Sequence, residues 1–174
     1  MTSTFLRRTT SVAVLLGALA LTAVAVAASN TTVTTHKTSQ GKVLANSRGF
    51  SLYNFAKDTQ GGKGKAPKIT CYGKCATAWP PLLVKKGAKV VAGSRSGVNS
   101  KMLGTTKRRD GSLQATYNGW PLYTYGGDSH AGDSTGEGVK QFGAAWYLLK
   151  TNGQLVKCPR GQGPSTSGCL PQSY

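Results

Sequence analysis

Acidic residues and histidines are scarce in this 174-residue chain. It contains five Asp and Glu residues against 22 Lys and Arg residues, and only two histidines. Neither His36 nor His130 is followed by a recognisable nucleophile motif. Residues 93–97 (GSRSG) resemble a nucleophile elbow, but Arg95 stands where the nucleophilic serine is required. We therefore assign no catalytic residue from the sequence, and we predict that the protein is not an enzyme.

Long apolar runs are also scarce, and a prominent one occupies residues 11–28, close to the N-terminus. Arg7 and Arg8 precede this run, which ends in the small-residue sequence AVAA. The run is just long enough for an uncleaved membrane anchor. Its Ala-rich composition and small-residue ending favour instead a signal peptide over residues 1–28 that is cleaved. The twin arginines suggest the Tat route, but residues 9–11 (TTS) replace the expected apolar pair and favour the general secretory route.

The chain has four cysteines, and none precedes Cys71, so no cysteine is available for a lipid anchor at the cleavage site. In an exported chain, four cysteines point to two disulfides, for which three pairings exist. The local spacing favours Cys71 with Cys75 and Cys158 with Cys169. A c-type haem motif is absent, because three residues separate Cys71 from Cys75 and no histidine follows.

The excess of positive charge predicts attraction to polyanions. The net charge is +17, and loss of Arg7 and Arg8 would lower it by two, to +15. Anionic cell-wall or extracellular polymers, anionic lipids and nucleic acids all fit this charge, and the charge does not choose among them. No zinc-finger spacing or basic amphipathic helix accompanies it, so we expect no specific nucleic-acid partner. An ordinary solvated basic surface is the simpler interpretation. The sequence does not define an oligomeric state.

A ten-residue segment occurs twice, as GFSLYNFAKD at residues 49–58 and as GWPLYTYGGD at residues 119–128. Each copy is followed by a tryptophan with apolar neighbours, Trp79 in the first and Trp146 in the second. Such an internal repeat indicates one structural unit used twice, with each half burying the apolar face of the other.

Three dipeptides suited to tight hairpins lie between strand-like runs: Asp110-Gly111, Asn118-Gly119 and Asn152-Gly153. They predict that residues 103–107 pair with residues 113–117, and that residues 147–150 pair with residues 155–157. No segment keeps a helical period for three turns. The sequence therefore predicts an all-β fold with little helix, a compact sandwich or barrel-like sheet pair built from two related repeats.

The composition also divides the chain. We expect a polar lead-in at residues 29–40, in which residues 31–35 could form an edge strand, because Thr and Val suit a pleated surface. A polar surface excursion is expected at residues 84–100. The predicted divisions are a two-repeat β domain at residues 41–157, with repeats at about 41–100 and 101–157, and a Cys-stapled tail at residues 158–174.

The repeat places Tyr53 and Asp58 in positions equivalent to Tyr123 and Asp128. One interpretation is a pair of binding sites built from phenol and carboxylate. The favoured interpretation is structural, with each aspartate accepting backbone N–H bonds in the turn that ends its strand, and each tyrosine half-buried with its hydroxyl bonded.

Residues 128–137 gather Asp128, Asp133, Glu137 and His130 on a Gly-rich loop. The carboxylate oxygens of the three acids could hold calcium or another metal ion, although the spacing is not that of an EF-hand and a histidine is an unusual neighbour for calcium. The alternative is a polar loop without a metal, which is the favoured interpretation, and no cofactor is predicted.

The order of these motifs along the chain resembles that of a known protein family. Residues 41–44 (GKVL), the Tyr-x4-Asp repeats, Cys71 and Cys75, residues 79–82 (WPPL) and residues 109–111 (RDG) follow one another as in a known pattern. Over residues 41–156 the chain resembles the bacterial secreted-repeat family of predicted lipoproteins with a Tyr-x4-Asp motif. The resemblance implies an extracytoplasmic tandem-repeat protein of unassigned function. The missing lipidation cysteine departs from the lipoprotein members.

Two classes of function follow. The first is a secreted, non-enzymatic protein that associates with anionic envelope material through its charge. The second is an extracytoplasmic ligand- or metal-binding protein, redox-related in one version, that uses the repeated Tyr and Asp positions. Ionic strength separates them, because charge-driven association weakens as salt is added.

Overall fold

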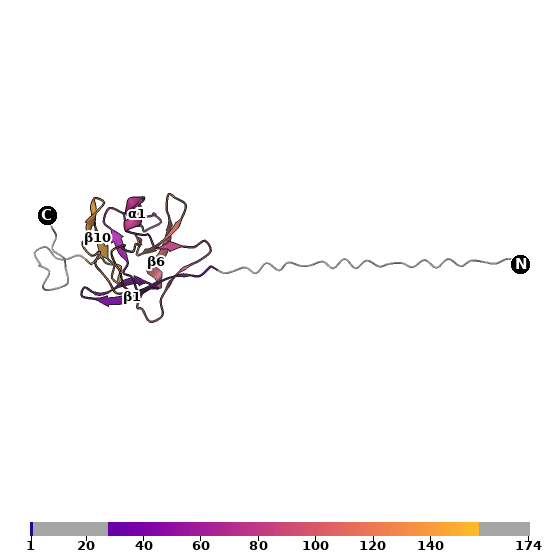
Figure 1. Cartoon of the computed structure of the whole chain (residues 1–174), viewed down its shortest axis with the longest axis horizontal. Helices are drawn as coiled ribbons and strands as arrows, with labels where there is room; N and C mark the ends of the chain where they lie inside the picture. The colour runs from indigo at the N-terminus through magenta and orange to yellow at the C-terminus, as the bar shows by residue number, and fades with distance from the viewer. Residues whose placement is uncertain (2–27, 157–174) are drawn as a thin grey trace, which may run out of the picture.

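A computed structural model describes residue 1 and residues 28–156 of the chain. The predicted signal peptide, apart from its first and last residues, and the predicted Cys158–Cys169 disulfide lie outside the described residues. Figure 1 shows the strands gathered in one body, with β1 and α1 at opposite sides of the view. Within the described residues no helix is long and apolar enough to span a membrane.

Short strands dominate the structure, as predicted, and the helix within residues 28–156 is limited to one turn of α-helix and one of 3-10 helix. The elements are β1 (Thr31–Thr38), β2 (Gly41–Asn46), β3 (Tyr53–Phe55), α1 (Lys74–Ala78), β4 (Leu83–Val84), β5 (Val90–Ala92), η1 (Ser100–Met102), β6 (Leu103–Lys107), β7 (Leu113–Tyr117), β8 (Trp120–Pro121), β9 (Lys140–Gln141) and β10 (Ala144–Leu148). They form three small sheets, in the orders β2-β1-β5, β3-β10-β9 and β4-β7-β6, and β8 pairs with β7.

The predicted hairpins are present. β6 and β7 pair antiparallel from Leu103 opposite Tyr117 to Lys107 opposite Leu113. The Asn118-Gly119 turn then brings Trp120 opposite Tyr117. Beyond β10, Leu149 bridges to Leu155 around Asn152-Gly153. These turns fix the register locally, because each contains residues with the positive φ that tight hairpins require.

The segment expected as a polar lead-in at residues 29–40 contains a strand, which is longer than the edge strand allowed for at residues 31–35 and does not lie at an edge. Most of this segment belongs to β1, an eight-residue strand that lies centrally in its sheet, antiparallel to β2 and parallel to β5. Val33 is fully buried on it. The threonines that made the segment look solvated are residues that suit a pleated strand. Because β5 lies within residues 84–100, that segment is also not simply a surface excursion.

The two repeats follow the same path. Each begins with a hairpin, β1–β2 in the first and β6–β7 in the second, and each continues into its copy of the ten-residue segment. The two copies meet where Tyr53 and Tyr123 face each other in an antiparallel bridge. Tyr53 N–H donates to the Tyr123 carbonyl at 2.8 Å, and Tyr123 N–H donates to the Tyr53 carbonyl at 3.0 Å. This reciprocal bridge marks the pseudo-twofold axis of the domain.

The core divides into two clusters on either side of the repeated segment. In residues 51–55 every residue is buried, so this segment is covered on both faces. Tyr53 and Phe55 belong to an aromatic cluster with Trp79 and Trp146, whereas Leu52 belongs to an aliphatic cluster. Alternation along one strand therefore supplies both halves of the core.

Candidate functional site

The repeated tyrosines and aspartates pair across the two repeats and not within them. The Tyr53 hydroxyl donates to Asp128 Oδ2 at 2.8 Å, and the Tyr123 hydroxyl donates to Asp58 Oδ2 at 2.6 Å. We call these two interactions the crossed pairs. They follow from the Tyr53–Tyr123 bridge, because each tyrosine at the pseudo-twofold axis extends its ring into the opposite repeat.

A threonine supplies the remaining hydrogen bonds to each carboxylate, in the same way in both repeats. Thr70 donates its backbone N–H and its hydroxyl to Asp58 Oδ1, both at 2.8 Å. Thr135 donates the same two groups to Asp128 Oδ1, at 3.0 and 2.7 Å. Each aspartate thus accepts three hydrogen bonds, and Asp58 and Asp128 are only 4% and 6% exposed. Both oxygens of each carboxylate are occupied by the protein itself.

This arrangement differs in its partners from the turn-capping interpretation of the sequence. The aspartates do accept backbone N–H groups, but the donors stand in loops 12 and 7 residues further along the chain. The tyrosine hydroxyl that donates to each aspartate belongs to the other repeat. Both tyrosines are fully buried and not half-buried.

Burial shifts the proton affinities of these groups. It raises the pKa of Asp58, although the bonds from Tyr123 and Thr70 and the nearby charge of Arg108 oppose the shift. Burial and the charge of the partner aspartate raise the pKa of both Tyr53 and Tyr123 far above the ordinary tyrosine value. Both phenols therefore stay protonated and act as donors throughout the physiological range.

The surroundings of the crossed pairs are not symmetric. Near Asp58 lies Arg108, which is buried and donates to the Gln114 side chain at 2.6 Å and to the Cys71 carbonyl at 2.7 Å. Near Asp128 lies His36, whose Nε2 is 2.8 Å from Ser51 Oγ. Burial lowers the pKa of His36, and the charge of Asp128 opposes this shift. A permanent cation thus neighbours one carboxylate, and a largely neutral imidazole neighbours the other.

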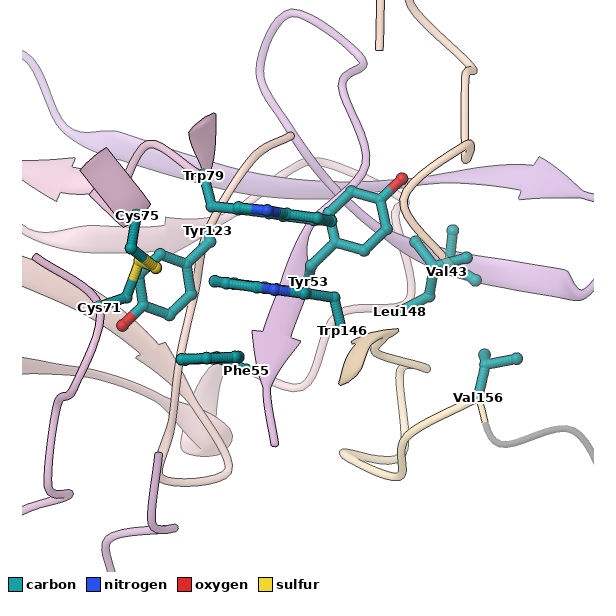
Figure 2. Close-up of a cluster of buried hydrophobic side chains, with 10 residues drawn as sticks. All are labelled: Val43, Tyr53, Phe55, Cys71, Cys75, Trp79, Tyr123, Trp146, Leu148 and Val156. Atoms are coloured by element: carbon teal, nitrogen blue, oxygen red, sulfur yellow. A yellow bond between two sulfur atoms is a disulfide. The ribbon is translucent and has the colours of Figure 1, made fainter. Parts of the chain in front are cut away.

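The aromatic cluster obeys the same pseudo-symmetry. Trp79 and Trp146, one from each repeat, stack with centroids 4.0 Å apart and ring planes within 3°. Tyr125 stacks on the outer face of Trp79 at 4.0 Å, and Phe55 stacks on the outer face of Trp146 at 4.2 Å. Figure 2 shows Trp79, Trp146 and Phe55 as parallel layers, with Tyr53 and Tyr123 at their edges. The two tyrosine rings meet the tryptophans edge-on, at 5.4 and 5.2 Å. Tyr125, Trp79, Trp146 and Phe55 thus form a four-ring stack, in which the rings come alternately from the second and the first repeat.

The Cys71–Cys75 disulfide is present and buried beside this cluster. Cys75 lies in α1, which ends where the Trp79 N–H donates to the Cys75 carbonyl at 2.8 Å. The disulfide therefore fixes the approach of Trp79 to the stack, and Figure 2 shows it next to the Tyr123 ring.

The candidate metal ligands are not brought together. Asp128 is occupied by Tyr53 and Thr135, and Asp133 accepts the backbone N–H groups of Ser129 and His130, both at 2.8 Å. Glu137 turns inward and accepts the Leu148 N–H at 2.6 Å. In the part of the chain that the structure describes, no group of three or more His, Cys, Asp and Glu residues could hold a metal ion. The acidic side chains of this loop bond to the loop itself and to β10, so the described residues do not form the metal site that the sequence left as an alternative.

Glu137 is a further buried acid, 1% exposed, whose second carboxyl oxygen has no hydrogen-bond partner within the described residues. Burial raises the pKa of Glu137 to about 8, against the opposing effects of the Leu148 N–H and the charge of Lys150. This carboxyl group is therefore mainly protonated at neutral pH.

These observations define the class: an all-β domain of two intertwined repeats with a shared aromatic core. A family model described as a secreted repeat of unknown function matches the chain twice, at residues 34–83 and 104–150. The matched segments include both copies of the ten-residue segment and cover more than half of the chain. The protein belongs to this family of secreted repeats, as its resemblance implied. No curated protein and no solved structure matches the chain.

Several residues around the crossed pairs were not found from the sequence. Thr70 and Thr135 stand at different distances from their aspartates, so the repeat does not align them. Arg108 lies in an ordinary basic turn sequence, and only its burial sets it apart. His36 was assigned to a lead-in that is in fact a strand. The Thr that precedes a Cys or Gly after each Tyr-x4-Asp segment is the one signal that could have pointed to the threonines.

Proposed function

We propose that this secreted domain is a non-enzymatic module that binds anionic polymers of the cell envelope through a cationic surface. The observation that carries the proposal is the separation of charge by sign. The acidic residues face inward or bond within their own loops, and the basic residues face outward. The exterior is therefore more uniformly positive than the composition alone requires.

All five acids have partners within the protein. Asp58 and Asp128 lie in the crossed pairs, and Glu137 is buried against the Leu148 N–H. Asp110 accepts from Ser112 and Arg108, and Asp133 accepts from the backbone of its own loop. Within residues 28–156, Arg108 is the one Lys or Arg residue that is buried. A polyanion approaching this surface meets ammonium and guanidinium groups with few carboxylates between them.

Three surface grooves support the proposal, because each has Lys or Arg and no acidic residue in its lining. The first, of about 490 Å³, is lined by Lys65 and Lys101 together with glycine backbone and threonine side chains. The second, of about 530 Å³, is lined by Lys37, Lys42 and Arg95. The third, of about 330 Å³, is flanked by Lys85 and Lys86. Grooves of this kind suit the phosphate or carboxylate groups of an extended polymer.

The test is binding of the purified mature protein to an immobilised glycerol-phosphate polymer, measured while sodium chloride is increased. Binding should weaken steeply with ionic strength, since exposed charges are screened. The variant Lys65→Glu/Lys101→Glu should bind more weakly than wild type. The matched variant Lys65→Arg/Lys101→Arg keeps the charge and should bind like wild type.

Binding that is indifferent to salt, or that is equal in the Glu and Arg variants, would contradict the proposal. Circular dichroism of each variant checks that the fold is retained. These positions are exposed, so the substitutions should leave it intact.

A further inference from the structure

The hairpin that joins β9 to β10 carries an unexpected residue at its tip. Gln141 pairs with Ala144, which leaves Phe142 and Gly143 as a two-residue turn. Both have positive φ, 57° at Phe142 and 87° at Gly143. A turn with positive φ at both central positions strongly favours Asn-Gly, and a bulky residue in this conformation is a steric outlier.

The same chain builds an equivalent turn with the favoured residues. Asn118-Gly119 joins β7 to β8 with φ values of 47° and 76°. Local folding would therefore be satisfied better by Asn than by Phe at position 142. Phe142 is 42% exposed, so a large part of this bulky residue faces solvent. A conformationally costly, exposed aromatic residue needs a reason outside the fold of the hairpin.

The hairpin is firmly held and is accompanied by basic side chains. The Trp79 Nε1–H donates to Gln141 Oε1 at 2.8 Å, which ties the base of the turn to the aromatic cluster. The Lys57 ammonium lies over the turn, 3.5 Å from where a Cβ on Gly143 would stand. Lys140, on β9, is exposed two residues before Phe142. The tip therefore presents an apolar ring beside positive charge on a rigid support.

We propose that the Phe142 tip docks on a bilayer that carries anionic phospholipid headgroups, with the ring in the interfacial region and Lys57 and Lys140 at the phosphates. Aromatic rings combined with lysines are the combination that binds such interfaces without a membrane-spanning segment. A hydrated polymer offers no apolar layer for the ring.

This docking goes beyond the polymer binding proposed above, because it adds an apolar contribution at one defined site. The experiment is co-sedimentation of the mature protein with vesicles of phosphatidylglycerol and phosphatidylcholine, and with vesicles of phosphatidylcholine alone. Wild type should bind the mixed vesicles and should bind the neutral vesicles much more weakly. Phe142→Asn should reduce binding to the mixed vesicles by about five- to tenfold, the effect of losing burial of part of a Phe ring.

Phe142→Trp is the matched control, since it keeps an aromatic ring at the tip of the same hairpin. It should bind the mixed vesicles like wild type. Phe142→Asn should unfold at a temperature no lower than wild type, because Asn suits the positive φ better. The loss of binding then cannot be attributed to loss of the fold.

Equal vesicle binding by wild type and Phe142→Asn would overturn the inference, as would an equal loss of binding in Phe142→Trp. Binding to the glycerol-phosphate polymer separates the two proposals. Phe142→Asn should bind the polymer like wild type, and a matching loss there would assign the ring to polymer and not to lipid. If wild type binds the polymer but no vesicle, this inference fails and the proposed function stands.

Discussion

At the residue scale, Asp58 and Asp128 are carboxylates enclosed by three donors each. A buried charge is tolerated only when its hydrogen bonds are complete, so each donor matters more here than it would at the surface. The crossed pairs thus convert two acidic residues into internal links between the repeats.

Replacing these carboxylates should weaken the fold. We expect Asp58→Asn and Asp128→Asn each to cost about 1 kcal/mol, since Asn keeps one acceptor oxygen, and the Ala variants to cost about 3 kcal/mol. Denaturant unfolding of the single variants beside wild type measures this. Unfolding like wild type, combined with loss of polymer binding, would assign the pairs to function and not to folding.

Double-mutant cycles test the crossing itself. Tyr53→Phe combined with Asp128→Ala should show a coupling of about 1–2 kcal/mol, because the two side chains share a hydrogen bond. Tyr53→Phe combined with Asp58→Ala should be additive to within about 0.5 kcal/mol, since no hydrogen bond joins this pair within the described residues. The opposite result would mean that the tyrosines pair within their own repeats.

Glu137 should make stability depend on pH. Its folded pKa of about 8 exceeds the ordinary value of 4.5, so the folded protein holds a proton that the unfolded chain releases between these values. Stability contributed by the neutral acid is fully present below about pH 4.5 and is lost as pH rises towards 8. The Glu137→Gln variant stays neutral at this position. Its free energy of unfolding should therefore fall less than that of wild type between about pH 5 and about pH 9, by on the order of 3 kcal/mol. Urea unfolding of wild type and Glu137→Gln at both pH values measures this difference. An equal fall in the free energy of unfolding of the two proteins would refute the prediction.

At the scale of elements, the features predicted from the sequence are those that depend on residues close together along the chain. The β6–β7 pairing was predicted residue for residue, because the Asp110-Gly111 turn fixes the register. The central place of β1 was missed because it depends on parallel pairing with β5, far along the chain. No turn sequence between the two strands predicts such a contact. The crossed pairs were missed for a related reason. A repeat shows which residues are equivalent, but it does not show whether they interact within one copy or between copies.

Two glycines in hairpin turns should differ sharply in their tolerance of a side chain. Gly111 and Gly119 both have positive φ, but Gly111 faces open space, whereas a Cβ on Gly119 would collide with the Gly61 carbonyl oxygen. Gly111→Ala should cost about 1 kcal/mol through backbone strain alone. Gly119→Ala should cost at least about 2 kcal/mol more, because the loop at Gly61 must also move. Thermal unfolding of the pair measures the difference, and similar losses would contradict the predicted contact.

The Cys71–Cys75 bridge closes a short loop, with a sequence separation of 4. Its removal in Cys71→Ala/Cys75→Ala should therefore cost about 2 kcal/mol, the lower end of the range for disulfides. The fold should persist, since the stack of Trp79 on Trp146 remains. Near-ultraviolet circular dichroism and urea unfolding test both statements. A variant without tertiary structure would mean that the bridge, and not the stack, organises this half.

At the scale of the whole molecule, neither repeat completes its own core. The four-ring stack alternates between repeats, and each buried carboxylate needs a tyrosine from the other half. A mature chain that ends at residue 100 should therefore show no cooperative unfolding and no near-ultraviolet circular dichroism. Mixing it with a chain of residues 101–174 should restore both signals. A folded first half in isolation would show that the repeats are independent units.

The crossed pairs also have a consequence for the time at which this protein can fold. Tyr53 and Asp128 are 75 residues apart along the chain, and Asp58 and Tyr123 are 65 apart. Contacts of such long range form late and slowly. A chain that emerges from a membrane N-terminus first has no partner for Tyr53, Trp79 or Asp58 until its second half has followed. In a chain exported N-terminus first, we therefore expect the leading half to stay unfolded during passage, and the crossed pairs to form only after the second half has crossed.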